Sequence, residues 1–228
     1  MKTNNKGLTE SGFTLVEIAI VLVIIGLLLG GILKGQEMIT QAKIKNVIND
    51  FNGVTAAVNS YQDRYRALPG DDPSANTRWS AQGAVQGNGD GALQGLYNAA
   101  STATLVTGQE SNLFWWHLRL GGFVPGAVTA GVVAAGAQPP NATNGIIGVQ
   151  SSIGGTANLG FSSNIVCSSN LPDKIAIAVD TQMDDGTPSA GEVRGQKQAQ
   201  PNETVLGASN VSNYQETGQN QYMLCKNL

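Results

Sequence analysis

The sequence predicts an α+β protein in which a long amino-terminal helix precedes a loop-rich head domain. Three observations support this prediction. Residues 13–33 are almost entirely apolar, residues 44–65 carry apolar side chains at helical spacing, and later segments have strand-type composition between Gly-rich stretches. The length of 228 residues is enough for one domain with an appended element.

The composition favours a protein that functions outside the cytoplasm. Charged residues make up only 13% of the chain, glycines number 29, and the formal net charge is −3. Binding to nucleic acid phosphates needs a basic patch, so this composition does not indicate a nucleic acid partner.

The first apolar segment is long enough to cross a membrane. Residues 1–12 are polar with two lysines, and residues 13–33 are apolar apart from Thr14 and Glu17. A helix needs about 20 such residues to span a bilayer, whereas a secretory signal has a shorter apolar region followed by a cleavage site. The basic flank predicts a cytoplasmic amino terminus and an exported head.

The residues around Gly12 resemble a known processing signal. Gly12 is followed by Phe-Thr-Leu-Val-Glu, which resembles the prepilin signature of type IV pilins and type II secretion pseudopilins. The resemblance implies that a prepilin peptidase removes residues 1–12 and N-methylates Phe13. It also implies a pilin-like antiparallel sheet in the head, and assembly with related subunits on an inner-membrane platform driven by a cytoplasmic ATPase.

A carboxylate inside the apolar run needs an explanation. An ionised side chain in hydrocarbon costs roughly 3 kcal/mol on insertion scales and usually marks function. Cleavage after Gly12 creates an ammonium at Phe13, one helical turn from Glu17. The resemblance implies that Glu17 pairs with the Phe13 amine of a neighbouring subunit during assembly. The alternative is a polar residue tolerated near the membrane interface.

Glycines take the place of the proline that many pilins carry about twenty residues into the mature helix. They are Gly26, Gly30, Gly31 and Gly35. Each costs a helix about 1 kcal/mol relative to Ala, so the stretch is a candidate for melting in a filament. Alternatively, these small residues allow close packing between helices.

Beyond the apolar run the helix is predicted to become one-sided. It should end near Arg66, before Leu68-Pro69-Gly70, with a length of roughly 80 Å. A coiled-coil dimer has a similar period, but tyrosines in the seam favour packing on a sheet. The stripe consists of Ile44, Val47, Phe51, Val54, Val58, Tyr61 and Tyr65.

The remaining residues predict a head with two short helices and several strands. One helix is expected over 110–120, with Gly121 and Gly122 ending it. A second is expected after Pro172, with Gly186 as its stop, although its IAIAV stretch also alternates like a strand. Strands are expected over 124–133, 146–150, 159–167 and 222–225.

The domain prediction divides the chain into a leader (1–12), a membrane and assembly helix (13–33), its amphipathic continuation (34–67) and a head (68–228). The two cysteines, Cys167 and Cys225, predict one disulfide in an exported head. Two separate thiols or a metal pair are the alternatives.

Oxygen-rich, Gly-containing loops in the head make calcium a candidate ligand. Asn and Asp alternate around Gly in GNGDG (87–91), but the EF-hand spacing fails, and solvated turns are the competing explanation. Some secretion pseudopilins bind calcium in the head, so the resemblance supports a site. The candidate ligands are Asp71, Asp72, Asn88, Asp90, Asp184 and Asp185.

No pattern in the sequence indicates catalysis. His117 is the single histidine, beside Trp115 and Trp116, and is expected to be a packing residue. The sequence therefore predicts a structural pilin-like subunit in the inner membrane, with calcium as the one candidate cofactor. The alternatives are a minor or tip subunit, an adhesin-like binding module with exposed aromatic rings, and a membrane-anchored enzyme.

Overall fold

The computed structural model describes residues 14–102, 104–129, 131, 133–153 and 158–228. The chain divides into two compact units, Met1–Gln41 and Ala42–Leu228, and we call the second unit the head. The division falls inside the first helix. The elements are α1 (Leu15–Tyr65), α2 (Ala75–Arg78), η1 (Ser80–Gln82), α3 (Glu110–Leu120), η2 (Val133–Ala135), β1 (Ile147–Ser151), β2 (Asn164–Pro172), α4 (Asp173–Met183), β3 (Val193–Gln198), η3 (Ala208–Asn210) and β4 (Gln221–Asn227).

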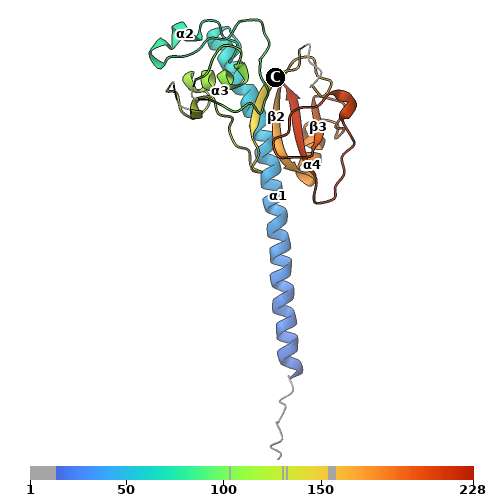
Figure 1. Cartoon of the computed structure of the whole chain (residues 1–228). Helices are drawn as coiled ribbons and strands as arrows, with labels where there is room; N and C mark the ends of the chain where they lie inside the picture. Colours follow the sequence, from blue (N-terminus) through green and yellow to red (C-terminus); the bar gives the residue numbers. More distant parts are fainter. Residues whose placement is uncertain (1–13, 103, 130, 132, 154–157) are drawn as a thin grey trace, which may run out of the picture. The chain divides into compact units, whose positions relative to one another are not determined.

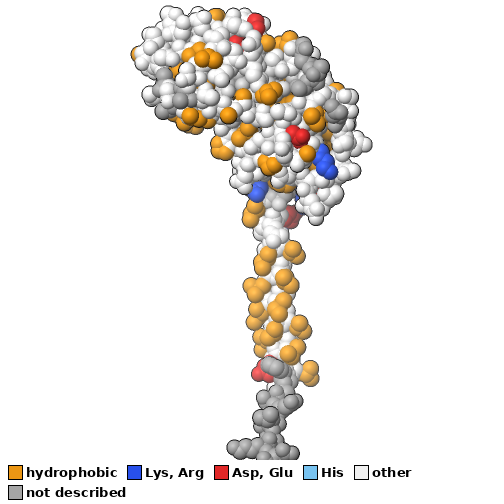
Figure 2. All heavy atoms as spheres, in the orientation of Figure 1, with side chains coloured by type: hydrophobic (Ala, Val, Ile, Leu, Met, Phe, Trp, Pro, Cys, Tyr) orange, Lys and Arg blue, Asp and Glu red, His pale blue; other side chains and the backbone are white. Residues whose placement is uncertain are grey.

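The described part of the first unit consists of α1 and has apolar side chains exposed along its length (Figure 2). An 18-residue window of this helix has a mean hydropathy of 2.8 and is 0% buried, so the helix is long and apolar enough to cross a membrane. The helix is continuous through Gly26, Gly30, Gly31 and Gly35. In a single subunit, therefore, these glycines do not break it.

In the head, the continuation of α1 buries the predicted apolar stripe. Six of its seven members, from Ile44 to Tyr61, are buried, and Tyr65 is half-buried against the same core. The stripe packs with residues of the sheet and of α4, such as Leu224 and Val179. The stripe therefore packs on the sheet, as predicted, and the head helices α3 and α4 complete the same core.

The sheet has four antiparallel strands in the order β1-β2-β4-β3 (Figure 1). Side chains alternate between its two faces, because successive residues of a strand point to opposite sides. Val166 and Leu224 belong to the core that contains α1. Ile165 and Met223, on the other face, belong to a second core with Leu159, Phe161 and Val205. Both faces are thus buried, which gives the α+β pilin-like fold expected from the sequence.

The two cysteines form the predicted disulfide. Cys167 of β2 and Cys225 of β4 are directly opposite each other in the strand register, with Cα atoms 4.0 Å apart. The bridge therefore connects the two central strands of the sheet in the second core.

The predicted strand over 124–133 is wrong. None of its described residues is in a strand, and η2 begins at its end. Side chains of α3 bind the backbone of this segment instead: Arg119 Nε donates to the Pro125 carbonyl, and Trp116 Nε1 donates to the Val128 carbonyl. Because these carbonyls accept hydrogen bonds from side chains of α3, they do not pair with a neighbouring strand.

The strand predicted over 159–167 is shifted. Leu159 and Gly160 have φ values of 48° and 82°, which a strand does not accept, and β2 begins only at Asn164. It continues through polar residues to Pro172, with an irregularity between Ser168 and Leu171. Strand β3 was missed entirely, because its sequence VRGQKQ lacks the apolar alternation that identifies strands.

The other predicted elements of the head are confirmed. Strand β4 contains the expected segment 222–225, β1 covers 147–150 of the expected 146–150, and α3 occupies the expected residues. Gly122 has φ 76°, and the Phe123 amide donates to the Leu118 carbonyl, so the helix ends in a Schellman motif. Helix α4 also forms, with Pro172 as its N-cap residue and not in its first turn.

Loss of the disulfide should weaken the head without unfolding the part of α1 that belongs to the first unit. We expect Cys167→Ser to lower the free energy of unfolding by about 2–5 kcal/mol, because the cross-link restricts the unfolded chain. Urea denaturation of the full-length protein in detergent, followed by tryptophan fluorescence, measures this. Wild-type protein under reducing conditions is the matched comparison, and an unchanged midpoint there would contradict the prediction.

Candidate functional site

The amino-terminal turn of α1 holds Glu17 in a reciprocal capping box. Both the amide and the hydroxyl of Thr14 donate to Glu17 Oε2, at 2.9 and 2.8 Å, and the Glu17 amide approaches Thr14 Oγ1 at 3.3 Å. Such a box satisfies backbone donors at a helix start. The carboxylate therefore has donors within its own subunit, while the predicted cleavage residues Gly12 and Phe13 lie outside the described residues.

In the head, the Asp71 carboxylate binds backbone amides of the GNGDG turn (87–91). One carboxylate oxygen accepts from the amides of Gly89 and Asp90, and the other accepts from Gly91 at 2.7 Å. A side chain on Gly87 would collide with the Asp71 backbone, at 2.3 Å from its Cα. The turn is consequently packed directly against the residue that binds it.

Glu110, the first residue of α3, completes this arrangement. Its two oxygens accept from the amides of Asn88 and Gln94, at 3.1 and 2.9 Å. Asp71, Asp90 and Glu110 each offer a carboxylate oxygen within 4.8 Å of the others, and we call them the loop cluster. Burial raises the pKa of Glu110, and the neighbouring charges of Asp71 and Asp90 add to this.

Asp72 has a different role from the one predicted. It accepts hydrogen bonds from the Tyr61 hydroxyl at 2.7 Å and the Ser74 amide at 2.8 Å, and it pairs with Arg78. Burial acts to raise its pKa, but these bonds and the Arg78 charge lower it overall. Asp72 thereby fastens the end of α1 to the following loop instead of joining the loop cluster.

Asp184 and Asp185 lie in a second acidic group together with Asp180. The sequence analysis did not identify Asp180 as a candidate. We call these three residues the helix-end cluster, because they follow one another at the carboxyl end of α4. The spacing of four residues between Asp180 and Asp184 places them one helical turn apart and was the available signal. The six predicted calcium ligands are therefore not one site.

His117 is fully buried and connects two loops. Its Nδ1 accepts the Gly70 amide at 3.0 Å, so the proton is on Nε2, which donates to the Val85 carbonyl at 2.8 Å. Burial lowers the pKa of His117 to about 4, outweighing the bond to Val85 that favours the charged form. The residue is a neutral structural link, as its packing role predicts.

Burial of the tryptophans counts against an adhesin-like surface built on them. Trp115 and Trp116 are 1% and 2% exposed. Trp79 is half-buried, packed beside Tyr65 with the Arg78 guanidinium over its ring. These rings contribute to the interior of the head.

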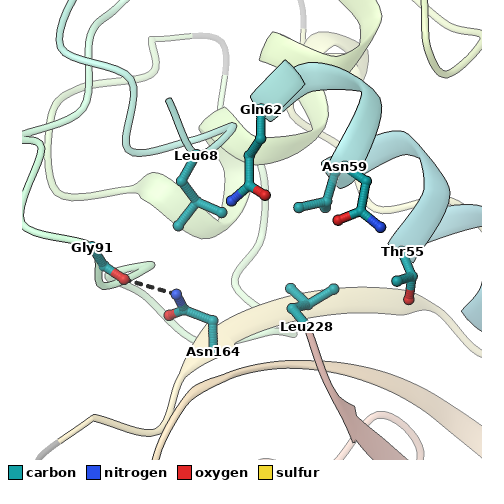
Figure 3. A pocket seen from close by; sticks show the side chains of 8 residues that line it. Thr55, Asn59, Gln62, Leu68, Gly91, Asn164 and Leu228 are labelled. Atoms are coloured by element: carbon teal, nitrogen blue, oxygen red, sulfur yellow. Dashed lines mark hydrogen bonds between the residues drawn. The ribbon is translucent and has the colours of Figure 1, made fainter. Parts of the chain in front are cut away.

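A small pocket of about 320 Å³ lies where α1 approaches the end of the chain (Figure 3). Asn59 and Gln62 extend into it from α1, opposite Asn164 and Leu228, and Asn164 Nδ2 donates to the Gly91 carbonyl at 2.8 Å. None of its eight lining residues has a titratable side chain. The pocket offers no side chain suited to general acid or base catalysis.

The long helix and the α+β head give a pilin-like fold, and among the described residues one helix, α1, is long and apolar enough to cross a membrane. The model of the prokaryotic N-terminal methylation motif matches residues 5–33, and the chain thereby carries the signature of the type IV pilin and pseudopilin family. No curated protein matches the sequence, and neither does any solved structure.

Acid should destabilise the head through His117. The unfolded residue titrates near pH 6.5 and the folded one near 4. Unfolding therefore takes up a proton below pH 6.5, and the stability contributed by the neutral ring is complete above that value. We expect a loss of up to about 3 kcal/mol between pH 6.5 and 4.

Urea denaturation across this pH range checks the prediction against His117→Gln. The amide side chain keeps a donor and an acceptor but does not titrate. The variant should depend less steeply on pH than the wild type, whereas parallel pH profiles would contradict the assignment.

Proposed function

We propose that the protein is a structural subunit of a type IV pilus or a type II secretion pseudopilus. The observation that carries the proposal is the methylation motif at residues 5–33, which includes the apolar first part of α1, whose surface is exposed in the single chain. Such a surface needs lipid or other helices around it. Pilins as a family are structural proteins and not enzymes.

The proposed path begins in the inner membrane. The chain inserts with its amino terminus in the cytoplasm and its head in the periplasm, supported by the basic residues before the span. A prepilin peptidase cuts after Gly12 and methylates Phe13. The subunit then moves from lipid into a filament of its own or related subunits, on an inner-membrane assembly platform.

Glu17 is the proposed assembly residue. In the separate subunit its carboxylate is bound by Thr14, within the first helical turn. In the filament it pairs with the Phe13 ammonium of a neighbour, and low dielectric strengthens that attraction. This feature favours a position in the body of the filament over a tip position.

Processing predicts a defined mass. Protein purified from its native membrane should lack residues 1–12 and carry one added methyl group at Phe13. Intact-mass spectrometry measures both changes at once. A full-length, unmodified mass would contradict processing and would favour a tethered head with another role.

Glu17→Ala should separate insertion from assembly. Loss of one partner from a buried ion pair costs about 3–5 kcal/mol, so we expect filament incorporation to fall at least about 100-fold while insertion and cleavage persist. The matched control is Glu37→Ala, which removes an exposed acid paired with Lys34 on the same helix. Normal incorporation of the Glu17 variant, measured in sheared filament fractions, would refute the pairing.

A further inference from the structure

A groove of about 490 Å³ lies beside α1 in the head. Helix α1 contributes Asp50 and Gly53 to its lining, and the residues around them are mostly apolar, among them Phe123, Pro125 and Pro139. A mostly apolar groove with a few polar groups is the usual form of a binding site. The groove is therefore a candidate docking site for another molecule.

Asp50 gives the groove an unpaired negative charge. The residue is half-buried, and no hydrogen bond or ion pair joins its carboxylate to another described residue. Burial raises the pKa of Asp50. A carboxylate that loses water without gaining a partner is unfavourable, so the groove suits a cation on an apolar stem.

Arg119 also lines the groove, but it does not supply this cation. The residue is only 8% exposed, and its guanidinium donates to carbonyl oxygens of the segment after α3, such as those of Pro125 and Ala137. It forms no ion pair with Asp50. A lysine from outside the subunit has the required form, because its ammonium group is carried on a four-carbon stem.

Lys45 lies on the side of α1 that a neighbouring copy would need. It is exposed and forms no ion pair with the described residues. Five residues separate it from Asp50, which corresponds to about 140° around the helix. Lys43, seven residues before Asp50, lies within about 20° of it. Two parallel copies of one helix face each other with opposite sides, so Lys45 can reach a neighbour's Asp50 and Lys43 cannot.

The offset between copies in the proposed filament brings the same two residues to one level. Glu17 of one copy pairs there with Phe13 of its neighbour, which is four residues earlier in the chain. Because the copies are identical, they are offset by about 6 Å along the helix. The same offset places Asn46 of the neighbour level with Asp50. Lys45 of the neighbour is then only one residue away from that level.

We propose that the groove is a docking site for a second copy of this chain, whose Lys45 enters it and pairs with Asp50. The apolar stem of the lysine packs against Phe123 and Pro125, and its ammonium group meets the carboxylate. The inference rests on the proposed function, because it uses the offset set by Glu17. It adds a contact between heads, outside the membrane, that determines how neighbouring copies orient.

Cysteine cross-linking in sheared filaments tests the contact. Copies with Asp50→Cys are coexpressed with copies with Lys45→Cys and treated with a short bismaleimide. The native cysteines are joined in a buried disulfide, so the introduced thiols react. We expect at least about tenfold more mixed dimer than from Asp50→Cys with Lys43→Cys, because Lys43 lies on the other side of the helix. No dimer, or equal yields from the two mixtures, would overturn the pairing.

Exchange of the two charges tests the attraction itself. Asp50→Lys should lower filament incorporation at least about tenfold, because it places like charges opposite each other. In the double variant Asp50→Lys and Lys45→Asp every groove again meets an opposite charge, so incorporation should recover. Asp63→Asn, an exposed acid on the same helix outside the groove, is the matched control. Normal incorporation of Asp50→Lys, or no recovery in the double variant, would contradict the proposal.

Gly53→Gln fills the groove without changing its charge. A Cβ at Gly53 would meet no atom within 4 Å, and Gln is a better helix former than Gly. The variant should therefore melt in detergent no lower than the wild type, while its incorporation falls at least about tenfold. Asn52→Gln, at an exposed position outside the groove, is the matched control. Normal incorporation of Gly53→Gln would refute docking in the groove.

The same samples separate this inference from the proposed function. Filaments of processed wild-type protein, without the mixed dimer of Asp50→Cys and Lys45→Cys copies, would refute the docking alone. Absence of wild-type filaments would refute the proposed function and, with it, the inference. Poor incorporation of Gly53→Gln without the mixed dimer would assign the groove to another partner and refute a second copy as its occupant.

Discussion

The burial of one stripe of α1 against the sheet is the interaction on which the rest of the head depends. From Ile44 to Tyr61 the helix presents apolar residues at intervals of three and four, and strands and α4 close over them. Residues 15–33 of the same helix are apolar on all sides apart from Glu17. One continuous element therefore meets two kinds of surroundings, and the change in its sequence pattern determines which residues the head covers.

Much of the remaining head is held by polar side chains bonded to backbone. Asp71 and Glu110 gather the amides of the GNGDG region, and Arg119 gathers carbonyls from the segment after α3. His117 fastens two further loops. Long segments without regular structure leave many backbone groups unpaired, so a few buried charged or neutral polar side chains replace the hydrogen bonds that strands would have made.

The sequence indicated the elements whose signals are local. The period of the α1 stripe predicted its buried face, and the paired glycines after Leu120 predicted the end of α3. Strand β3 was beyond such reasoning, because its pairing with β4 places polar residues such as Gln196 in a buried environment. The local sequence pattern does not reveal a partner strand that is more than twenty residues away in the chain.

The candidate site residues, too, could be predicted only where their signal is local in the sequence. Glu17 stood out because it is a charge within an apolar run, and the disulfide followed from the pair of cysteines. The calcium prediction identified oxygen-rich turns. It could not distinguish a carboxylate that is free to bind an ion from one that stabilises a loop, because the difference lies in which backbone amides donate to each carboxylate. Asp180 was missed because it belongs to a helix and becomes a neighbour of Asp185 only through the turn after Met183.

The disulfide also changes what a protease could do to the head. Cys167 and Cys225 are 58 residues apart, and the chain between them contains α4, β3 and the exposed stretch before β4. A single cut in that stretch would leave both fragments covalently joined, with β4 still paired between β2 and β3. A subunit nicked there would keep its central strands together and would reveal the damage only after reduction.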